Sequence, residues 1–336
     1  MPEHNNNKNA ALTDTGSLLT SRFEPIADEL AQVTDYISQK LTSPYKAVNQ
    51  RLEHITARTG KMLRPAMVLL AGKTCGRING SHIEIAAVTE LIHSATLLHD
   101  DVIDEAENRR KTPTANSLWG NESAVLMGDF VLSTVFAAVC GLRSSESRTL
   151  LSETAMRICQ GELLQNIQHN NWSMTEDEYI RIITDKTASL FQTCCYLGAV
   201  TADADDKKLR ALADFGLNTG IAFQISDDLL DIIGNENKVG KTLGTDLAKR
   251  KPTLPVIHFL QTAGSSEKVD YIEQLTNGTD LTELAKQLDR AGSLRYTQQM
   301  TENYCKKALE AIKIFDGSPA KDALTMITAF TAARCV

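Results

Sequence analysis

The sequence has few aromatic residues, few prolines and no recognisable cysteine motif. Of its 336 residues, 5% are aromatic, 8 are proline and 7 are cysteine. The cysteines are odd in number and form no CxxC pair, and Cys194 directly precedes Cys195, so neither a disulfide framework nor a zinc site is indicated. We therefore expect a protein of a reducing compartment, most simply a cytoplasmic one.

Long apolar runs and an excess of positive charge are also missing. Nothing in the chain approaches the ~18 uninterrupted apolar residues of a membrane span, so we expect no integral membrane segment. The 42 acidic side chains outnumber the 35 basic ones, which gives a net charge of -7. This balance argues against a nucleic-acid partner bound through overall basicity. An anionic ligand would need a local basic patch.

The first twenty residues are polar and rich in asparagine. They lack the charged and apolar regions of a signal peptide, so we expect 1–20 to be a disordered tail. No Ser/Gly/Pro-rich linker divides the rest, and 21–336 is predicted to form a single all-α domain. Runs of alternating polarity are few and no βαβ pattern is present.

Two helical segments are apolar on most faces. Residues 84–99 and 211–226 have this pattern, which predicts helices buried in the middle of a large bundle. Gly216 and Gly220, four residues apart, predict that one helix closely approaches a neighbour there. The predicted helices are 24–40, 43–58, 62–75, 82–105, 114–119, 122–141, 145–170, 175–200, 207–234, 253–263, 267–276, 280–291, 294–314 and 319–333.

Two apolar helices end in the same acidic pattern, DDxxD. The first is HSATLLHDDVID at 93–104 and the second is FQISDDLLD at 223–231. The first and last aspartates of each motif lie one helical turn apart, about 6 Å, and repel each other unless cations separate them. Oxygen ligands favour Mg²⁺ completed by substrate phosphates. One copy alone is as typical of a solvated helix end, but two copies favour metal ligands: Asp100, Asp101, Asp104, Asp227, Asp228 and Asp231.

Basic and polar residues at the margins of these motifs suit a diphosphate bound to the metals. Each also has a simpler interpretation: an ordinary helix start, a solvated loop or a core histidine. The lysine within the apolar helix around 186 needs a partner in any case. The candidates are Lys61, Arg64, His93, Arg109, Arg110, Lys186, Gln224, Lys241 and Lys251.

Several motifs resemble, in sequence and order, those of the trans-isoprenyl diphosphate synthases, the polyprenyl synthetase family. They are GKMLRP, HSATLLHDDVID followed by RR, GELLQ, DKTASLF, GIAFQISDDLLD and KPTLP. The resemblance runs from about residue 24 to the C-terminus and is strongest to long-chain octaprenyl, heptaprenyl or solanesyl synthases. It implies an isoprenoid-synthase-type bundle around a central apolar cavity, and a homodimer. One departure is Lys111, where the family usually has glycine.

The resemblance also implies the roles of the candidate residues. The six aspartates would hold three Mg²⁺ ions on an allylic diphosphate. The residues that would contact this diphosphate or its metals are Arg109, Lys186, Gln224, Lys241 and Lys251. The residues that would bind isopentenyl diphosphate are Lys61, Arg64, His93 and Arg110. No Ser-His or Cys-His arrangement suggests a protein nucleophile, which agrees with ionisation of the allylic diphosphate.

The product length is predicted from the wall below the first motif. Ala95 and Thr96 lie one turn below Asp100 and are small, so a growing chain passes them; Met127 or Phe136 is the candidate floor. The predicted product is a long all-trans polyprenyl diphosphate, a quinone side-chain precursor handed to a membrane at its surface. Farnesyl or geranylgeranyl diphosphate is the expected primer.

Three alternatives stay open at this point. A medium-chain geranylgeranyl or farnesyl diphosphate synthase uses the same motifs. A terpene cyclase would not need the isopentenyl site, so Lys61, Arg64 and His93 argue against it. A non-catalytic regulatory subunit of a heteromeric synthase would not need two intact DDxxD motifs.

Overall fold

The computed structural model describes residues 23–56, 61–109, 112–234, 244–277 and 280–333, and in this part of the chain the predicted all-α fold is confirmed. The only strands among these residues are β1 (Asn108–Arg109) and β2 (Thr112–Pro113), an antiparallel pair. The helical elements are η1 (Glu24–Ile26), α2 (Ala27–Lys40), α3 (Lys46–Thr56), α4 (Leu63–Cys75), α5 (Gly80–Ile103), α6 (Ala115–Gly141), α7 (Ser145–Ile167), α8 (Glu176–Ile183), η2 (Thr184–Ala188), α9 (Ser189–Thr201), α10 (Asp206–Ile233), α12 (Thr245–Ala248), α13 (Leu254–Thr262), α14 (Ser265–Asn277), α15 (Leu281–Arg290), α16 (Ser293–Ala311), η3 (Ile312–Ile314) and α17 (Pro319–Ala333).

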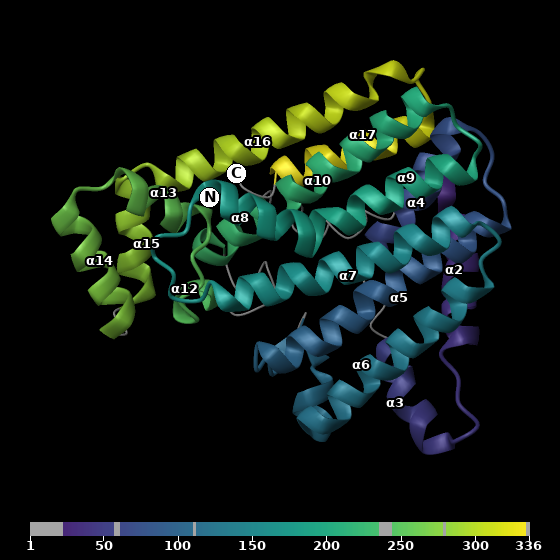
Figure 1. Cartoon of the computed structure of the whole chain (residues 1–336), viewed down its shortest axis with the longest axis horizontal. Helices are drawn as coiled ribbons and strands as arrows, with labels where there is room; N and C mark the ends of the chain where they lie inside the picture. The colour runs from purple at the N-terminus through teal and green to yellow at the C-terminus, as the bar shows by residue number, and fades with distance from the viewer. Residues whose placement is uncertain (1–22, 57–60, 110–111, 235–243, 278–279, 334–336) are drawn as a thin grey trace, which may run out of the picture.

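The centre of the bundle is formed by α4, α5, α9 and α10. These helices pack on one another and are covered by α2, α6, α7, α16 and α17 (Figure 1). Every residue of α4 from Pro65 to Gly72 is buried, as is every residue of α5 from Ile85 to Ile92. Helices that are apolar on all sides are stable only when neighbours surround them. The predicted burial of 84–99 and 211–226 is therefore confirmed for most of their residues.

Two glycines of α10 let it approach the preceding helices closely. A Cβ at Gly216 would lie 2.5 Å from the carbonyl oxygen of Phe191, and one at Gly220 would lie 2.6 Å from the Cα of Ala188. Side chains at either position would push the helices apart. The close approach predicted from the spacing of these glycines is confirmed.

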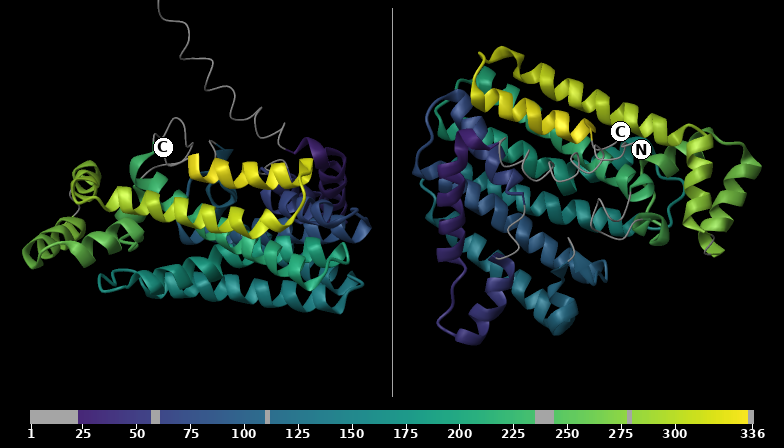
Figure 2. Two further views of the ribbon diagram at one scale, coloured as in Figure 1. Left: turned by 90° about the horizontal axis from the view of Figure 1, so that it is seen from above. Right: turned by 180° about the vertical axis from the view of Figure 1, so that it is seen from behind.

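A smaller group of helices, α13, α14 and α15, extends from one end of the molecule (Figure 2). It has its own apolar cluster, which includes Phe259, Tyr271, Leu284 and Leu288. The segment α12 to α13 joins this group to the end of the bundle where α5 and α10 end. That end carries both acidic motifs.

One helix of the described residues, α6, is long and apolar enough to cross a membrane by length and composition. A buried helix of a globular bundle passes the same test. One face of α6 packs on α5, with Met127, Val131 and Val135 buried there. Gly120 has a left-handed φ of 81° and kinks this helix, between the two separate helices predicted from the sequence.

Candidate functional site

The first acidic motif lies on the last turn of α5, against the β1–β2 pair. Asp101 is buried, with 2% of its surface exposed, while Asp100 and Asp104 are partly exposed. The Nε of Arg109, on β1, donates to Oδ1 of Asp101 at 2.7 Å. The hydroxyl of Thr114 donates to the carbonyl oxygen of Ala106 at 2.6 Å and ties the hairpin to the helix end. The hairpin thus places Arg109 on the motif.

Lys186 lies beside this motif, in the π-helical segment η2. Its ammonium group donates to Oε1 of Gln165 at 2.7 Å and forms an ion pair with Glu162, both on α7. A π-turn inserts an extra residue into a helix and is often found at functional sites. Gly161 makes the contact possible, because a Cβ there would lie 2.8 Å from the Cα of Lys186. The partly buried Lys186 therefore has the partners that its apolar surroundings require.

Burial raises the pKa of Asp100 to about 6, although Lys186 opposes the shift. Glu162 and Asp104 add to the rise by like-charge repulsion. A carboxyl in this position is stabilised as an anion when a cation binds next to it. This is the electrostatic setting of a cation site rather than of a solvated helix end.

The second acidic motif lies on the last turns of α10. Asp228 and Asp231 are buried and Asp227 is partly exposed. The hydroxyl of Tyr179 donates to Oδ2 of Asp228 at 2.6 Å, and Nε2 of Gln224 donates to Oδ1 at 2.8 Å. Burial and the charge of Asp246 raise the pKa of Asp228 to about 7, although both hydrogen bonds lower it.

The carboxylate of Asp231 holds the segment that follows the second motif. It accepts from the hydroxyl of Thr245 and from the backbone N–H of Asp246, both at 2.9 Å. The backbone N–H of Gly244 donates to the Asp231 carbonyl oxygen at 2.7 Å. Asp231 thus anchors α12 against the end of α10.

The two acidic motifs are joined through residues 245–251. The ammonium groups of Lys249 and Lys251 lie 2.7 Å and 3.1 Å from Oδ1 of Asp104. Lys251 is also 4.0 Å from Oδ1 of Asp246, whose backbone is bound by Asp231. Burial alone would raise the pKa of Asp104, but Lys251 and Lys249 lower it to about 2. Contacts therefore run continuously from the end of α5 to the end of α10.

The ligand set suits a hard divalent cation such as Mg²⁺. The exposed oxygens belong to carboxylates, and two ammonium groups already occupy cation positions at Asp104. No three His, Cys, Asp or Glu side chains in the described part converge closely enough to hold a metal by themselves. Mg²⁺ usually keeps water molecules and is completed by substrate phosphates, so the site fits this ion.

Two of the residues expected at isopentenyl diphosphate, Lys61 and Arg64, lie around the start of α4. The ammonium group of Lys61 lies 5.2 Å from the ring centre of Phe330, and the guanidinium of Arg64 lies 5.2 Å from that of Phe191. His93 is partly buried on α5, two turns before Asp100. Arg110 and Lys241 lie outside the described residues.

The chain-length residues divide into interior and exterior positions. Ala95 and Met127 are buried, and Thr96 is partly buried with its hydroxyl bound to the His93 carbonyl oxygen at 2.8 Å. Phe136, by contrast, is 59% exposed. It projects from the outer side of α6, because the buried residues of this helix lie on the opposite face. Phe136 as a floor within this chain is therefore wrong, and Met127 is the candidate that remains.

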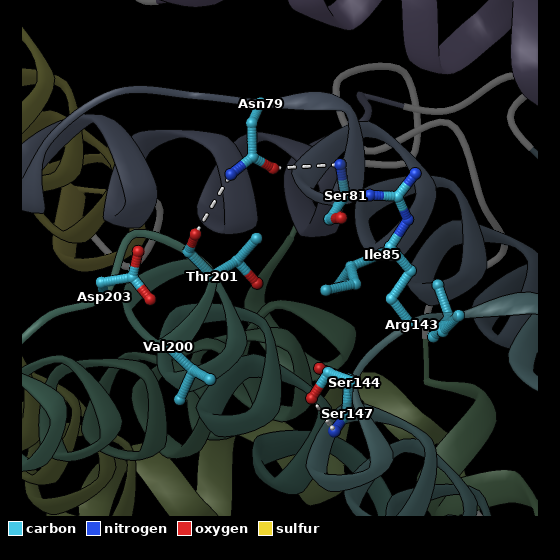
Figure 3. A pocket seen from close by; sticks show the side chains of 10 residues that line it. Asn79, Ser81, Ile85, Arg143, Ser144, Ser147, Val200, Thr201 and Asp203 are labelled. Carbon is cyan, nitrogen blue, oxygen red and sulfur yellow. Dashed lines mark hydrogen bonds between the residues drawn. The ribbon is translucent and has the colours of Figure 1, made fainter.

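A separate cavity of about 350 Å³ lies at the other end of α5 (Figure 3). It is lined by the starts of α5 and α7 and the end of α9. Asn79 caps α5 there, since its Oδ1 accepts from Ser81 N at 3.0 Å and its Nδ2 donates to the Thr201 carbonyl oxygen at 3.3 Å. The 24 residues of α5, about 36 Å of helix, separate this cavity from the aspartates. It has no part in the acidic site.

Several residues of the site were not identified from the sequence as binding residues. Glu162 and Gln165 belong to the GELLQ motif, at the i, i+3 spacing that places both on one helix face. Lys249 stands in the basic run KRK before a proline. Thr187 belongs to the DKTASLF motif, whereas Tyr179 has no local signal. The full set is Glu162, Gln165, Tyr179, Thr187, Thr245, Asp246 and Lys249.

An all-α bundle that brings two DDxxD motifs and several cations to one end has the architecture of an isoprenoid synthase. Residues 45–289 match the family model described as Polyprenyl synthetase. Octaprenyl diphosphate synthase of Escherichia coli (strain K12) is 36% identical over 305 residues, which are 90% of this chain and 94% of that protein. The chain belongs to the polyprenyl synthetase family, and it is a prenyltransferase.

Solved structures agree with the fold. Decaprenyl diphosphate synthase from Rhodobacter capsulatus has a TM-score of 0.88 at 32% identity, covering 95% of this chain and 99% of its own. Polyprenyl synthase from Caulobacter crescentus CB15, complexed with calcium and isoprenyl diphosphate, has a TM-score of 0.88 at 31% identity, covering 95% and 98%. The predicted isoprenoid-synthase fold is confirmed.

Proposed function

We propose that this enzyme condenses an allylic diphosphate head-to-tail with successive isopentenyl diphosphate units and releases a long all-trans polyprenyl diphosphate. The observation that carries the proposal is the line of contacts from Asp104 through Lys251 and Asp246 to Asp231. It brings carboxylates and cations from both motifs to one place, where a metal-bound diphosphate would sit. The octaprenyl and decaprenyl relatives support the long product.

The family resemblance implies three Mg²⁺ ions in the site. Three of the aspartates are the best candidates to hold them. Asp100, Asp104 and Asp227 are partly exposed, whereas Asp101, Asp228 and Asp231 are buried. When bound, the divalent ions supply positive charge that stabilises the departing diphosphate. The buried aspartates then act by fixing the shape of the site.

The chain's own cations complete the binding of the allylic diphosphate. Arg109, Lys186, Lys249 and Lys251 surround the first motif and can donate to diphosphate oxygens as negative charge develops on them. The resulting allylic carbocation is attacked by the isopentenyl double bond, and the departing diphosphate takes up the released proton. Apolar walls keep water away from the cation.

The proposed product length depends on the small side chains that line the cavity below the metal site. Ala95 is buried on α5 one turn before Asp100, and because its side chain is small it leaves room for a chain to pass. Each further CH₂ buried along the cavity contributes about 0.8 kcal/mol. We expect farnesyl or geranylgeranyl diphosphate to be the primer and the product to be longer than C20. This product would serve as a quinone side-chain precursor.

The test is a product assay with purified full-length chain, Mg²⁺, isopentenyl diphosphate and farnesyl diphosphate. Chromatography of the dephosphorylated products should give a long all-trans prenol. A C20 ceiling would favour a geranylgeranyl diphosphate synthase instead. Absence of activity in the isolated chain would favour a regulatory subunit of a heteromeric synthase.

The active form is proposed to be a homodimer. Large apolar side chains stay exposed on α6 and α7, and a partner surface would cover them. Sedimentation or light scattering at micromolar concentration should give twice the chain mass of 36.8 kDa. The exposed side chains are Leu118, Val125, Leu126 and Phe136 on α6 and Met156, Leu163, Leu164 and Ile167 on α7.

A cytoplasmic location is also proposed. The described cysteines are all free, which suits a reducing compartment. Handing the product to a membrane surface would then be a peripheral event.

A further inference from the structure

Tyr179 is a buried residue of α8 whose hydroxyl reaches the second acidic motif. A capping box formed by Thr175 and Glu178 fixes the start of α8. The tyrosine belongs to an apolar cluster with Ile183, Ile225 and other residues, and only 2% of its surface is exposed. Its hydroxyl donates to Oδ2 of Asp228 at 2.6 Å. Burial raises the pKa of this phenol well above its usual value, so it remains a donor at any physiological pH.

Asp228 points in a different direction from Asp227 around α10. It follows Asp227 by one residue and is therefore turned about 100° away around α10, toward α8. Its other oxygen accepts from Nε2 of Gln224, and the Oε1 of Gln224 accepts from the Thr187 hydroxyl at 2.8 Å. Donors on two helices thus hold both oxygens of Asp228 and prevent its carboxylate from rotating.

We propose that Tyr179 is a positioning residue that sets the divalent-cation affinity of the second motif. By holding Asp228, it fixes the last turns of α10 and therefore the direction in which Asp227 presents its carboxylate. Partners that orient metal ligands from behind typically change metal affinity 10- to 100-fold when they are removed. This inference rests on the proposed function, because it assumes that Asp227 binds the cation.

Tyr296, on α16, provides a matched control because its hydroxyl also bonds to a carboxylate of α8. Its hydroxyl donates to Oε2 of Glu176 at 2.7 Å, and Glu176 is the first residue of α8. Tyr296→Phe therefore removes the same kind of tyrosine–carboxylate hydrogen bond from α8, three residues before Tyr179. It leaves both acidic motifs untouched. Any effect that comes only from loosening α8 should be equal in the two variants.

The experiment measures Mn²⁺ binding to the full-length chain by calorimetric titration with saturating inorganic diphosphate. Wild type and Tyr296→Phe should bind within twofold of each other, and Tyr179→Phe should bind about tenfold more weakly. In steady-state assays, Tyr179→Phe should need a correspondingly higher Mg²⁺ concentration for half-maximal rate. Saturating Mg²⁺ should restore most of the rate, with the KM for isopentenyl diphosphate unchanged.

Two results would overturn the inference. One is Mn²⁺ affinity of Tyr179→Phe within twofold of wild type; the other is an equal loss in Tyr296→Phe. Circular dichroism and thermal midpoints of both variants identify a general loss of folding, which would also count against a specific role. If wild type itself binds no Mn²⁺ with diphosphate, the proposed function fails at its metal site, a result distinct from either of these.

Discussion

The ammonium group of Lys249 lies 2.7 Å from Oδ1 of Asp104, a residue 145 positions earlier in the chain. It also donates to the backbone carbonyl oxygen of Asp104 at 2.5 Å. Lys249, which follows the second acidic motif in the chain, therefore contacts the last aspartate of the first motif. A metal ion arriving at Asp104 would take the place of this ammonium group, which would then be free to bind the diphosphate.

Lys249→Met is expected to weaken binding of the allylic diphosphate. The change removes one charge-assisted hydrogen bond, so the KM for farnesyl diphosphate should rise roughly three- to tenfold. Arg250→Met is the control, because Arg250 donates instead to the carbonyl oxygen of Thr276 at 2.9 Å, away from the aspartates. An unchanged KM in Lys249→Met would show that its contact with Asp104 is not exchanged for one with substrate.

In the metal-free enzyme, the contribution of Asp100 to stability should be lost as the pH rises from about 4 to 6. The pKa of Asp100 is about 6 in the folded chain, against an ordinary value of 3.8, so the folded state binds more protons in this interval. Asp228, whose pKa is raised to about 7, acts in the same direction. The lowered pKa of Asp104 acts oppositely, but only below about pH 4.

Urea unfolding in the presence of a chelator measures this effect. Between pH 4 and pH 6, the free energy of unfolding of wild type should fall relative to that of Asp100→Asn. Added Mn²⁺ and diphosphate should reverse the trend, because the cation favours the ionised carboxylate. A difference between wild type and Asp100→Asn that stays constant over this interval in chelator would contradict the assignment.

Gly161→Ala is expected to displace Lys186. The added Cβ would lie 2.8 Å from the Cα of Lys186, so α7 and the π-helical segment must separate. Overpacking of this kind costs about 1–3 kcal/mol, and the turnover should fall as Lys186 moves away from the first motif. Gly141→Ala, at a glycine with no heavy atom within 4 Å of the added Cβ, should leave both stability and turnover nearly unchanged.

Ala95→Phe is expected to shorten the product without abolishing the first condensation. Ala95 is buried one turn below Asp100, and a phenyl ring there would obstruct the path of the growing chain. Chromatography of products from farnesyl diphosphate should show the shift. If the variant makes wild-type lengths at a normal thermal midpoint, the chain does not pass this position.

Tyr271→Phe is expected to stabilise the protein by about 1 kcal/mol. The hydroxyl of Tyr271 is fully buried between α13, α14 and α15 and has no hydrogen-bond partner in the described part of the chain. An unsatisfied buried hydroxyl costs about 1–3 kcal/mol, which phenylalanine avoids. The midpoint of urea unfolding should rise while the rate with farnesyl diphosphate stays the same. A lower midpoint would indicate a partner for the hydroxyl.

Most helices were predictable because their apolar periodicity is local information. The predicted break between 119 and 122 corresponds to the left-handed Gly120, and most residues of the apolar segments of α5 and α10 are buried as predicted. The β1–β2 pair and α12 were not predicted, since each is too short for a periodic pattern. Phe136 was misplaced because an apolar residue on a helix looks the same whether it faces the interior or a surface.

The sequence by itself determined the helical fold class, the two DDxxD motifs and the choice of oxygen ligands, because each depends on residues within a few turns of one another. Only the tertiary structure decided which side chains from other elements hold these aspartates. Arg109, Tyr179 and Thr245 occupy Asp101, Asp228 and Asp231, while Lys249 crosses to Asp104. These pairs depend on how separate helices pack, and no spacing along the chain contains that information.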